Sequence, residues 1–214
     1  MKKLVLLVLF GAIATAVSAQ FLIGGQFNIA SFKDKEAGNG ATREISSTLV
    51  TLIPRLAYVS GNIWYGVDAG VSLVNSKFDL GGNINETKST IATIAPFIRY
   101  VKRPVDNFGI WIEGQAGVSF GNEKDDAGSK TAEYTGFNVG LRPGVIFFIG
   151  DHLSFEASFG SLGYSLLTVT DPENTQVKET FSQAGLTLNS NSLSLDNTNF
   201  GIARGFLFGV NWMF

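Results

Sequence analysis

The stretch that decides the fold is TLIPRLAYV (51–59), which returns with small changes as TIAPFIRYV (93–101). Each copy carries a proline followed four residues later by tyrosine, inside a run that otherwise alternates as a β-strand does. Proline cannot donate a hydrogen bond to a sheet ladder, so within sheets it is confined to edges and bulges. A looser third copy is Pro143-x-x-x-Phe147. Three copies indicate a repeated structural unit with a bulge or bend at each proline.

The segments that follow the first two copies also resemble each other, as IWYGVDAGVS (63–72) and IWIEGQAGVS (110–119). Between each copy and the segment that follows it lies a short connection. Each unit is therefore predicted to be a β-hairpin around a tight turn.

The first nineteen residues have the pattern of a secretory signal peptide. Lys2 and Lys3 precede a short apolar run, and Val17-Ser18-Ala19 supplies small residues at a cleavage site. The apolar run is shorter than the ~20 residues that a membrane-spanning helix needs. We expect cleavage after Ala19, which leaves one domain over residues 20–214.

Composition excludes several kinds of protein. The chain has no cysteine and one histidine, so we expect neither a disulfide framework nor a metal site, and no cofactor. The net charge of −2 gives no basic patch for nucleic acid. Glycine (25 residues) and phenylalanine (18) are abundant, and 45% of residues are hydrophobic, yet none of the apolar segments after residue 19 is long. Alternating strands produce this mixture.

Alternation resolves the chain into eight segments with one apolar face and one small or polar face. They are 21–29, 50–58, 63–73, 92–100, 108–120, 137–147, 153–160 and 206–214. Such a pattern fits a β-sandwich with the apolar face inward, or a transmembrane barrel with that face toward lipid.

The connections favour the barrel. Short connections at 60–61, 102–106 and 149–151 alternate with long polar ones at 33–44, 76–89, 121–133 and 169–199. Short turns at one end and long loops at the other are typical of outer-membrane barrels. We therefore predict an all-β fold, an eight-stranded antiparallel up-and-down transmembrane β-barrel with short periplasmic turns, four longer outer loops and both termini periplasmic.

Along each strand the charged residues occupy the positions that alternate with the apolar ones, so they face the opposite side of the sheet. This pattern predicts a charge network in the lumen: Arg55, Asp68, Arg99, Glu113, Arg142 and Glu156. A charge on the lipid face would cost ~2–4 kcal/mol at the midplane. Eight strands leave an interior that side chains can fill, so we expect a plugged lumen.

The predicted turns also give a register. A two-residue turn at 60–61 places Arg55 opposite Gly66, with Asp68 diagonal to it. A three-residue turn at 149–151 places Arg142 opposite Ser158, with Glu156 diagonal. Arg99 and Glu113 are expected to be farther apart. The alternative to a plug is a gated channel, with Arg55–Asp68 or Arg142–Glu156 as its latch.

Aromatic residues lie just before the three short turns on the lipid-facing parity. Tyr58, Tyr100 and Phe147 are predicted to form an aromatic belt at the inner membrane interface.

With these features the chain resembles the small eight-stranded outer-membrane barrels of the OmpA/OmpX type, in particular the single-domain members common in the Bacteroidetes. The resemblance rests on the P-x-x-x-Y repeats, the W-x-x-x-x-A-G-V-S strands and the terminal GFLFGVNWMF (205–214). It implies a location in the outer membrane, contact with membrane lipid and lipopolysaccharide, and a terminal signal read by the barrel-assembly machinery. That signal would comprise Phe206, Phe208, Trp212 and Phe214.

The resemblance implies no single activity. Members are linked to envelope integrity, adhesion or defence through their surface loops, so we expect a structural or surface-interaction role with a partner bound by the four long loops. The alternating stretch 186–195 could extend a hairpin and bind a partner by strand addition. The alternative function is a narrow porin-like channel. A soluble lipocalin-like binder is a weaker third possibility, because this parity places Arg and Glu inside.

Enzymatic activity is not expected. Barrel enzymes that act on lipid A need a histidine with a serine and an acid near the outer rim, since a serine nucleophile needs a base within hydrogen-bond reach. The single histidine, His152, lies instead beside the short connection at 149–151.

Overall fold

The computed structural model describes residues 20–38, 41–80, 83–173, 176–187 and 206–214, and the predicted signal peptide lies outside these residues. The described residues form ten antiparallel strands: β1 (Gln20–Gly38), β2 (Ala41–Ser60), β3 (Ile63–Leu80), β4 (Asn83–Val105), β5 (Phe108–Asp125), β6 (Lys130–Ile149), β7 (Leu153–Phe159), β8 (Ser161–Thr170), β9 (Lys178–Thr187) and β10 (Phe206–Met213). None of the described segments is a helix long and apolar enough to cross a membrane.

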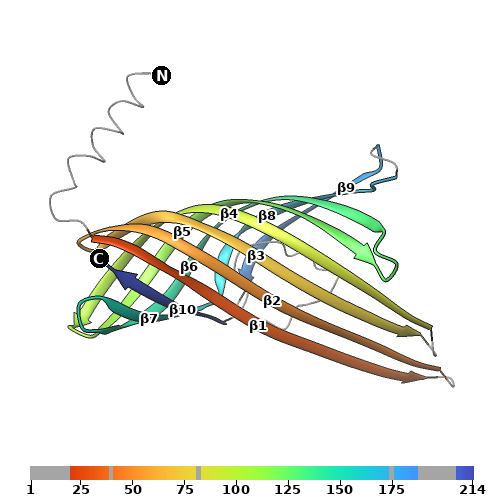
Figure 1. Cartoon of the computed structure of the whole chain (residues 1–214), viewed down its shortest axis with the longest axis horizontal. Helices are drawn as coiled ribbons and strands as arrows, with labels where there is room; N and C mark the ends of the chain where they lie inside the picture. The colour runs from red at the N-terminus through yellow and green to blue at the C-terminus, as the bar shows by residue number, and fades with distance from the viewer. Residues whose placement is uncertain (1–19, 39–40, 81–82, 174–175, 188–205) are drawn as a thin grey trace.

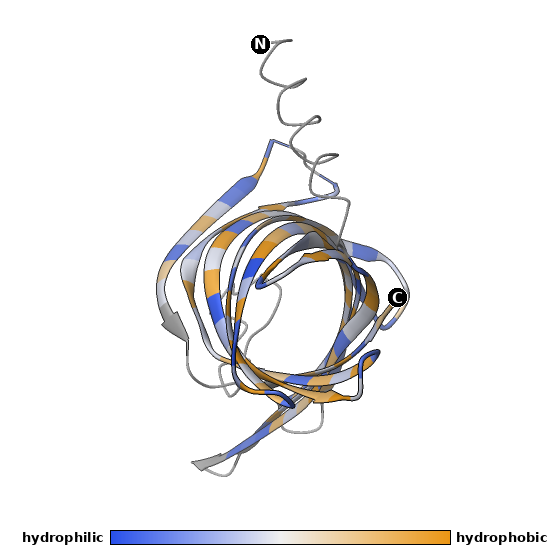
Figure 2. Ribbon diagram, turned by 90° about the vertical axis from the view of Figure 1, so that its left-hand side faces the viewer, coloured by the Kyte–Doolittle hydropathy of each residue, from blue (hydrophilic) through white to orange (hydrophobic). Residues whose placement is uncertain are grey.

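The strands close into a ring. Neighbours follow the order β5-β4-β3-β2-β1-β10-β7-β6, and β6 pairs with β5 to complete the circle. Figure 2 shows this ring with hydrophobic and hydrophilic residues alternating along each strand. The short turns and the C-terminus lie at one end of the molecule and the long hairpins project at the other (Figure 1). This is the predicted all-β barrel.

Ten strands occupy eight positions around the ring. β7 and β8 run one after the other along β6, while β10 pairs with β7 and β9 pairs with β8. The seventh position is thus β7 plus β8, and the eighth is shared by β10 and β9.

Gly160 separates β7 from β8 and adopts a φ of 70°, which favours glycine. Across this point Ser158 faces Gly144 and Leu162 faces Leu141, so one extra residue lies on the β7–β8 side. This arrangement is a β-bulge, and it reverses which residues of the strand face the lumen.

The apolar face points outward. On β1, Phe21, Ile23, Phe27 and Ile29 are exposed, whereas Leu22 and Gln26 are fully buried. Further toward the long hairpins the outward positions become polar, as at Lys33 and Lys35. The outward apolar band is the surface that lipid covers, and the projecting ends of the hairpins lie beyond it.

The three short turns differ slightly from their predicted positions. They consist of residues 61–62, 106–107 and 150–152. Gly61 and Gly150 have positive φ values of 57° and 65° and provide the reversals. Each turn lies later in the chain than the pattern predicted, which changes the register of the strands that follow.

The predicted long loops are mostly strands. β1 and β2 remain paired to Gly38 and Ala41, and β3 and β4 to Leu80 and Asn83. The prediction of loops at 33–44, 76–89 and 121–133 was therefore wrong, because continued ladder pairing makes these segments hairpin ends that project past the apolar band. Their polar composition reflects exposure to water.

The predicted loop 169–199 is also partly a hairpin. β9 pairs with β8 from Lys178 to Thr187, so only residues 171–177 connect the two strands. The rest of that loop, including most of the alternating stretch 186–195, lies outside the described residues.

Candidate functional site: a charge cluster above an apolar layer in the lumen

Six charged side chains from six strands meet in the inner half of the barrel, and each is at least 96% buried. Arg55 on β2 and Asp68 on β3 are directly opposite in register. Arg55 Nε donates to Asp68 Oδ1 and Nη2 donates to Oδ2, both at 2.7 Å. This two-pronged geometry is the strongest form of carboxylate recognition by arginine.

Glu113 on β5 is the centre of the cluster. It faces Arg99 of β4 on one side and Arg142 of β6 on the other. Its Oε2 accepts from Arg99 Nε at 2.9 Å and lies 3.0 Å from Arg55 Nη2, while its Oε1 accepts from Arg142 Nη2. One carboxylate therefore contacts all three arginines.

Glu156 on β7 completes the network from across the lumen. It forms ion pairs with Arg99 and, at 3.5 Å, with Arg55. The amides of Gln26 and Asn211, on β1 and β10, also donate to it. Three arginines and three carboxylates thus neutralise one another in a region that has little access to water.

The structure brings together all six residues of the predicted lumen network but changes their pairing. Asp68 faces Arg55 directly, not diagonally, because the turn is residues 61–62. The expected Arg142–Glu156 pair is wrong: the turn at 150–152 places Ser158 opposite Gly144, and Arg142 contacts Glu113 and Asp68. The expected separation of Arg99 and Glu113 is also wrong, since they are directly opposite.

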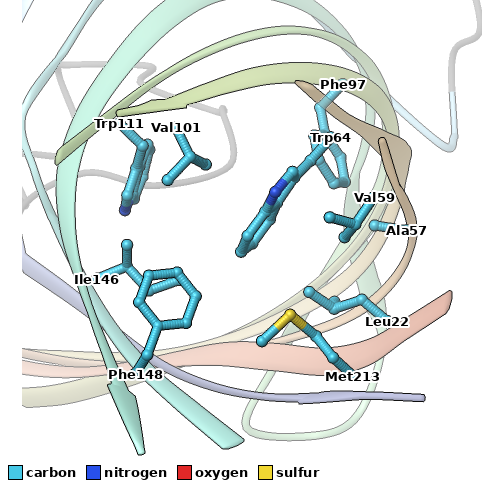
Figure 3. Packing of buried hydrophobic residues seen from close by; sticks show 10 residues of the cluster. All are labelled: Leu22, Ala57, Val59, Trp64, Phe97, Val101, Trp111, Ile146, Phe148 and Met213. Atoms are coloured by element: carbon cyan, nitrogen blue, oxygen red, sulfur yellow. The ribbon is translucent and has the colours of Figure 1, made fainter. Parts of the chain in front are cut away.

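An apolar layer lies in the lumen between this cluster and the short turns. Ten buried side chains form it, among them two tryptophans that point into the barrel (Figure 3): Leu22, Ala57, Val59, Trp64, Phe97, Val101, Trp111, Ile146, Phe148 and Met213. Sequence reasoning described the inward face as small or polar and missed this layer. The inward parity of Trp64, Phe97 and Trp111 was the signal that could have revealed it.

Arginine–aromatic contacts join the charged and apolar layers. The guanidinium carbon of Arg99 lies 3.8 Å from the ring centre of Trp111, and that of Arg55 lies 4.1 Å from the ring centre of Phe97. Such contacts stabilise a cation where water is excluded. The rings thereby restrict the positions of the guanidinium groups.

On the other side of the charge cluster the lumen is lined by hydroxyl groups. Cross-strand pairs link Thr51 to Ser72 at 3.0 Å and Thr93 to Ser119 at 2.8 Å. Farther out, Glu123 accepts hydrogen bonds from Ser89 and Tyr134. The outer half of the lumen is therefore polar, whereas its inner half holds the buried charges and aromatic rings.

The residues predicted for the belt and for the assembly signal lie mostly on the outer surface. Tyr100 and Phe147 are exposed near the short turns. Phe208 and Trp212 of β10 and the following residue, Phe214, are exposed as well. Tyr58 is half-buried against Tyr65, with ring centres 5.2 Å apart. The side chain of Phe206 lies outside the described residues, although its backbone pairs with Phe159. The roles assigned to these residues stay predictions.

His152 belongs to the third short turn. Its Nδ1 lies 2.8 Å from the Met213 carbonyl oxygen, and its ring stacks on Trp212 with centres 5.6 Å apart. Within the described part of the chain, acidic and histidine side chains form no group that could hold a metal ion.

The sequence matches a family model for the outer membrane protein beta-barrel domain over residues 4–214. A closed ring with an outward apolar band and inward charges agrees with this match. The chain belongs to this family. It is accordingly a transmembrane β-barrel of the bacterial outer membrane.

Two solved structures are similar to this chain. Neisserial surface protein A (NspA) is 13% identical, with a TM-score of 0.48 and coverage of 92% of this chain and 99% of that one. A major outer membrane protein from Thermus thermophilus is also 13% identical, with a TM-score of 0.42 and coverage of 92% and 100%. The curated proteins include no sequence that matches.

Proposed function

We propose that this protein is a non-conducting outer-membrane barrel that acts through its projecting hairpins, in envelope integrity, adhesion or the binding of a surface partner. The observation that carries the proposal is the presence of two buried layers in the lumen, the charge cluster and the apolar layer directly beside it. A solute would have to displace several buried ion pairs and then pass between Trp64 and Trp111. Both steps oppose conduction, because separating buried charges and desolvating a polar solute are costly.

Conductance of the refolded protein in a planar bilayer tests the proposal. Wild type, Asp68→Asn and Glu156→Gln would be compared, with Asp171→Asn outside the lumen as a control. We expect no unitary conductance in any of them, because removing one charge leaves the apolar layer intact. A reproducible conductance in wild type that rises in Asp68→Asn or Glu156→Gln would contradict a closed lumen.

The second candidate function is a narrow channel for ions or small solutes. The hydroxyl-lined outer half of the lumen favours it, since Thr51, Ser72, Thr93 and Ser119 would provide polar contacts along a path. In that case the charge cluster would be the gate, with the Arg55–Asp68 pair and the contacts of Glu156 as its switchable part.

The proposed partners at the membrane are lipid and lipopolysaccharide. Four lysines on the hairpins lie beyond the apolar band, with side chains 51–64% exposed: Lys33, Lys35, Lys77 and Lys88. At this height they would meet the phosphate-bearing head groups of the outer leaflet. For assembly, the exposed aromatics of β10 are proposed as the segment that the barrel-assembly machinery reads.

We also propose that the barrel is not an enzyme. The hydrogen bond and ring stacking of His152 give it a structural role in joining the third short turn to β10. A serine hydrolase would need this histidine as a base near the outer rim, and it lies at the opposite end of the barrel.

A further inference from the structure

Three glycines form a row across neighbouring strands on the lumen face. Gly140 of β6 faces Gly163 of β8, and Gly163 faces Gly185 of β9. Gln115 of β5 continues the row beside Gly140. A recess beside this row is lined in part by Gln115, Asn138, Arg142, Ser165 and Gln183.

The recess contains buried hydrogen-bond donors that have no partner among the residues that the structure describes. Arg142 is 1% exposed and directs Nη2 to Glu113 and Asp68. Its Nε and Nη1 have no hydrogen-bond partner within the described part of the chain. Asn138, 6% exposed, likewise has an unpartnered Nδ2. Buried polar groups in proteins are nearly always satisfied, so unpartnered donors that line one recess indicate a site for an acceptor.

The chemistry of these donors restricts what can bind. Arg142 Nε and Nη1 and Asn138 Nδ2 can donate but not accept, and Arg142 is permanently charged. An oxygen-rich anion could accept hydrogen bonds from both side chains. On the side of the recess formed by β9, the residues from Lys178 to Gly185 are all exposed.

We propose that this recess is a binding site for a small oxyanion, a carboxylate or phosphate group held by Arg142 and Asn138. The glycine row borders the site. At Gly140 and Gly163 the missing Cβ allows β6 and β8 to approach closely, because a Cβ there would lie 2.9 Å from the Leu162 carbonyl oxygen and 2.5 Å from the Val139 carbonyl oxygen, respectively. A Cβ at Gly185 would meet no atom within 4 Å, so the open space lies at that end of the row. The site does not depend on whether the barrel conducts.

Tryptophan fluorescence can test the site, because the Arg142 guanidinium lies 5.9 Å from the Trp111 ring centre. The barrel would carry Trp64→Phe and Trp212→Phe, so that Trp111 is the remaining tryptophan. In neutral detergent it would be titrated with inorganic phosphate and with acetate, using chloride to hold ionic strength constant. We expect a saturable change in emission with either oxyanion and none with chloride.

Variants at the recess decide the outcome. Asn138→Asp should weaken binding at least tenfold by placing a negative charge beside the anion, and Asn138→Leu should weaken it less. Asn28→Asp, in the lumen-facing wall of β1, is the matched control and should retain most of the affinity. Heat-modifiable gel migration would show that each variant is folded.

A repeat titration with a short-chain phosphatidic acid separates a lipid head group from a free ion as the source of the oxyanion. Saturation with lipid phosphate alone would assign the site to a head group. The absence of a saturable response to every probe, or an equal response in Asn138→Asp and wild type, would overturn the proposal.

Discussion

The Arg99 guanidinium lies 3.8 Å from the ring centre of Trp111 while the same side chain donates to Glu113 at 2.9 Å. One arginine therefore joins the apolar layer to the charge cluster. Disturbing either layer should therefore disturb the other.

Glu113→Gln should destabilise the barrel strongly. It removes the one carboxylate that contacts all three arginines and leaves their buried charges under-compensated, a change that typically costs ~3–5 kcal/mol. Urea-induced unfolding in lipid vesicles would measure the loss. Glu123→Gln, at the hydroxyl-lined end of the lumen, is the control and should cost much less. Equal losses in the two variants would show that Glu113 is not the centre of the network.

Gly144→Ala should displace Trp111. A Cβ at position 144 would overlap the six-membered part of the Trp111 ring and would lie 2.5 Å from the Ala157 carbonyl oxygen. Overpacking of this kind costs about 1–3 kcal/mol. Gly136→Ala on the same strand meets its nearest atom at 3.4 Å and serves as the control. A shift of tryptophan emission in Gly144→Ala but not in Gly136→Ala is expected; a normal emission in both would contradict the packing described for Trp111.

Opening the lumen should require changes in both layers. Trp111→Ala removes a large buried ring at a cost of about 3–5 kcal/mol but leaves the ion pairs in place. Combined with Glu156→Gln it removes part of each layer. Single-channel recording should detect conductance only in the double variant. Conductance in Trp111→Ala alone would mean that the apolar layer is the whole barrier.

The projecting hairpins should loosen in acid. The pKa of the Glu44 carboxyl is lowered from its ordinary value of 4.5, mainly by its hydrogen bond to Lys33 and then by that to Lys35. Lys77 does most to lower the pKa of Glu86 in the same way. A carboxyl with a lowered pKa in the folded state stabilises that state at neutral pH, and the contribution is lost as the pH falls through its folded pKa.

Hydrogen exchange of backbone amides near Asp34 and Ile45 would measure this effect. Protection should fall as the pH drops below the ordinary pKa of glutamate and through the lowered pKa of the folded state. It should also fall with added salt, because exposed ion pairs are screened. Glu44→Gln should abolish the pH response in the β1–β2 hairpin and leave it intact in the β3–β4 hairpin. A response that persists in Glu44→Gln would assign it to other groups.

Phe214→Ser should reduce the amount of assembled barrel in the outer membrane without preventing refolding in detergent. Phe214 is exposed, so little packing is lost, whereas a terminal assembly signal would be damaged. Heat-modifiable migration of membrane extracts would measure assembled protein, and refolding of the purified variant is the control. Normal assembly in cells would contradict the role predicted for the terminus.

The sequence determined which residues face lipid and which face the lumen. Side chains on a strand alternate with a period of two, so Arg55, Glu113 and Arg142 could be placed inside from their parity alone. The apolar positions of Thr51–Val59 and its repeat likewise identified the outward band. This information is local to each strand and needs no knowledge of its neighbours.

Only the tertiary structure decided which residues meet. Register between strands depends on the turn residues, and moving the first turn to residues 61–62 made Arg55 and Asp68 direct partners. The bulge at Gly160 reversed the parity of one strand and aligned Gly163 with Gly140 and Gly185. The sharing of Glu113 by three arginines arises from closure of the ring, which brings strands distant in sequence to one level of the lumen. Contacts across a closed ring depend on the register between every pair of neighbouring strands. The alternation of side chains within a single strand does not encode that register.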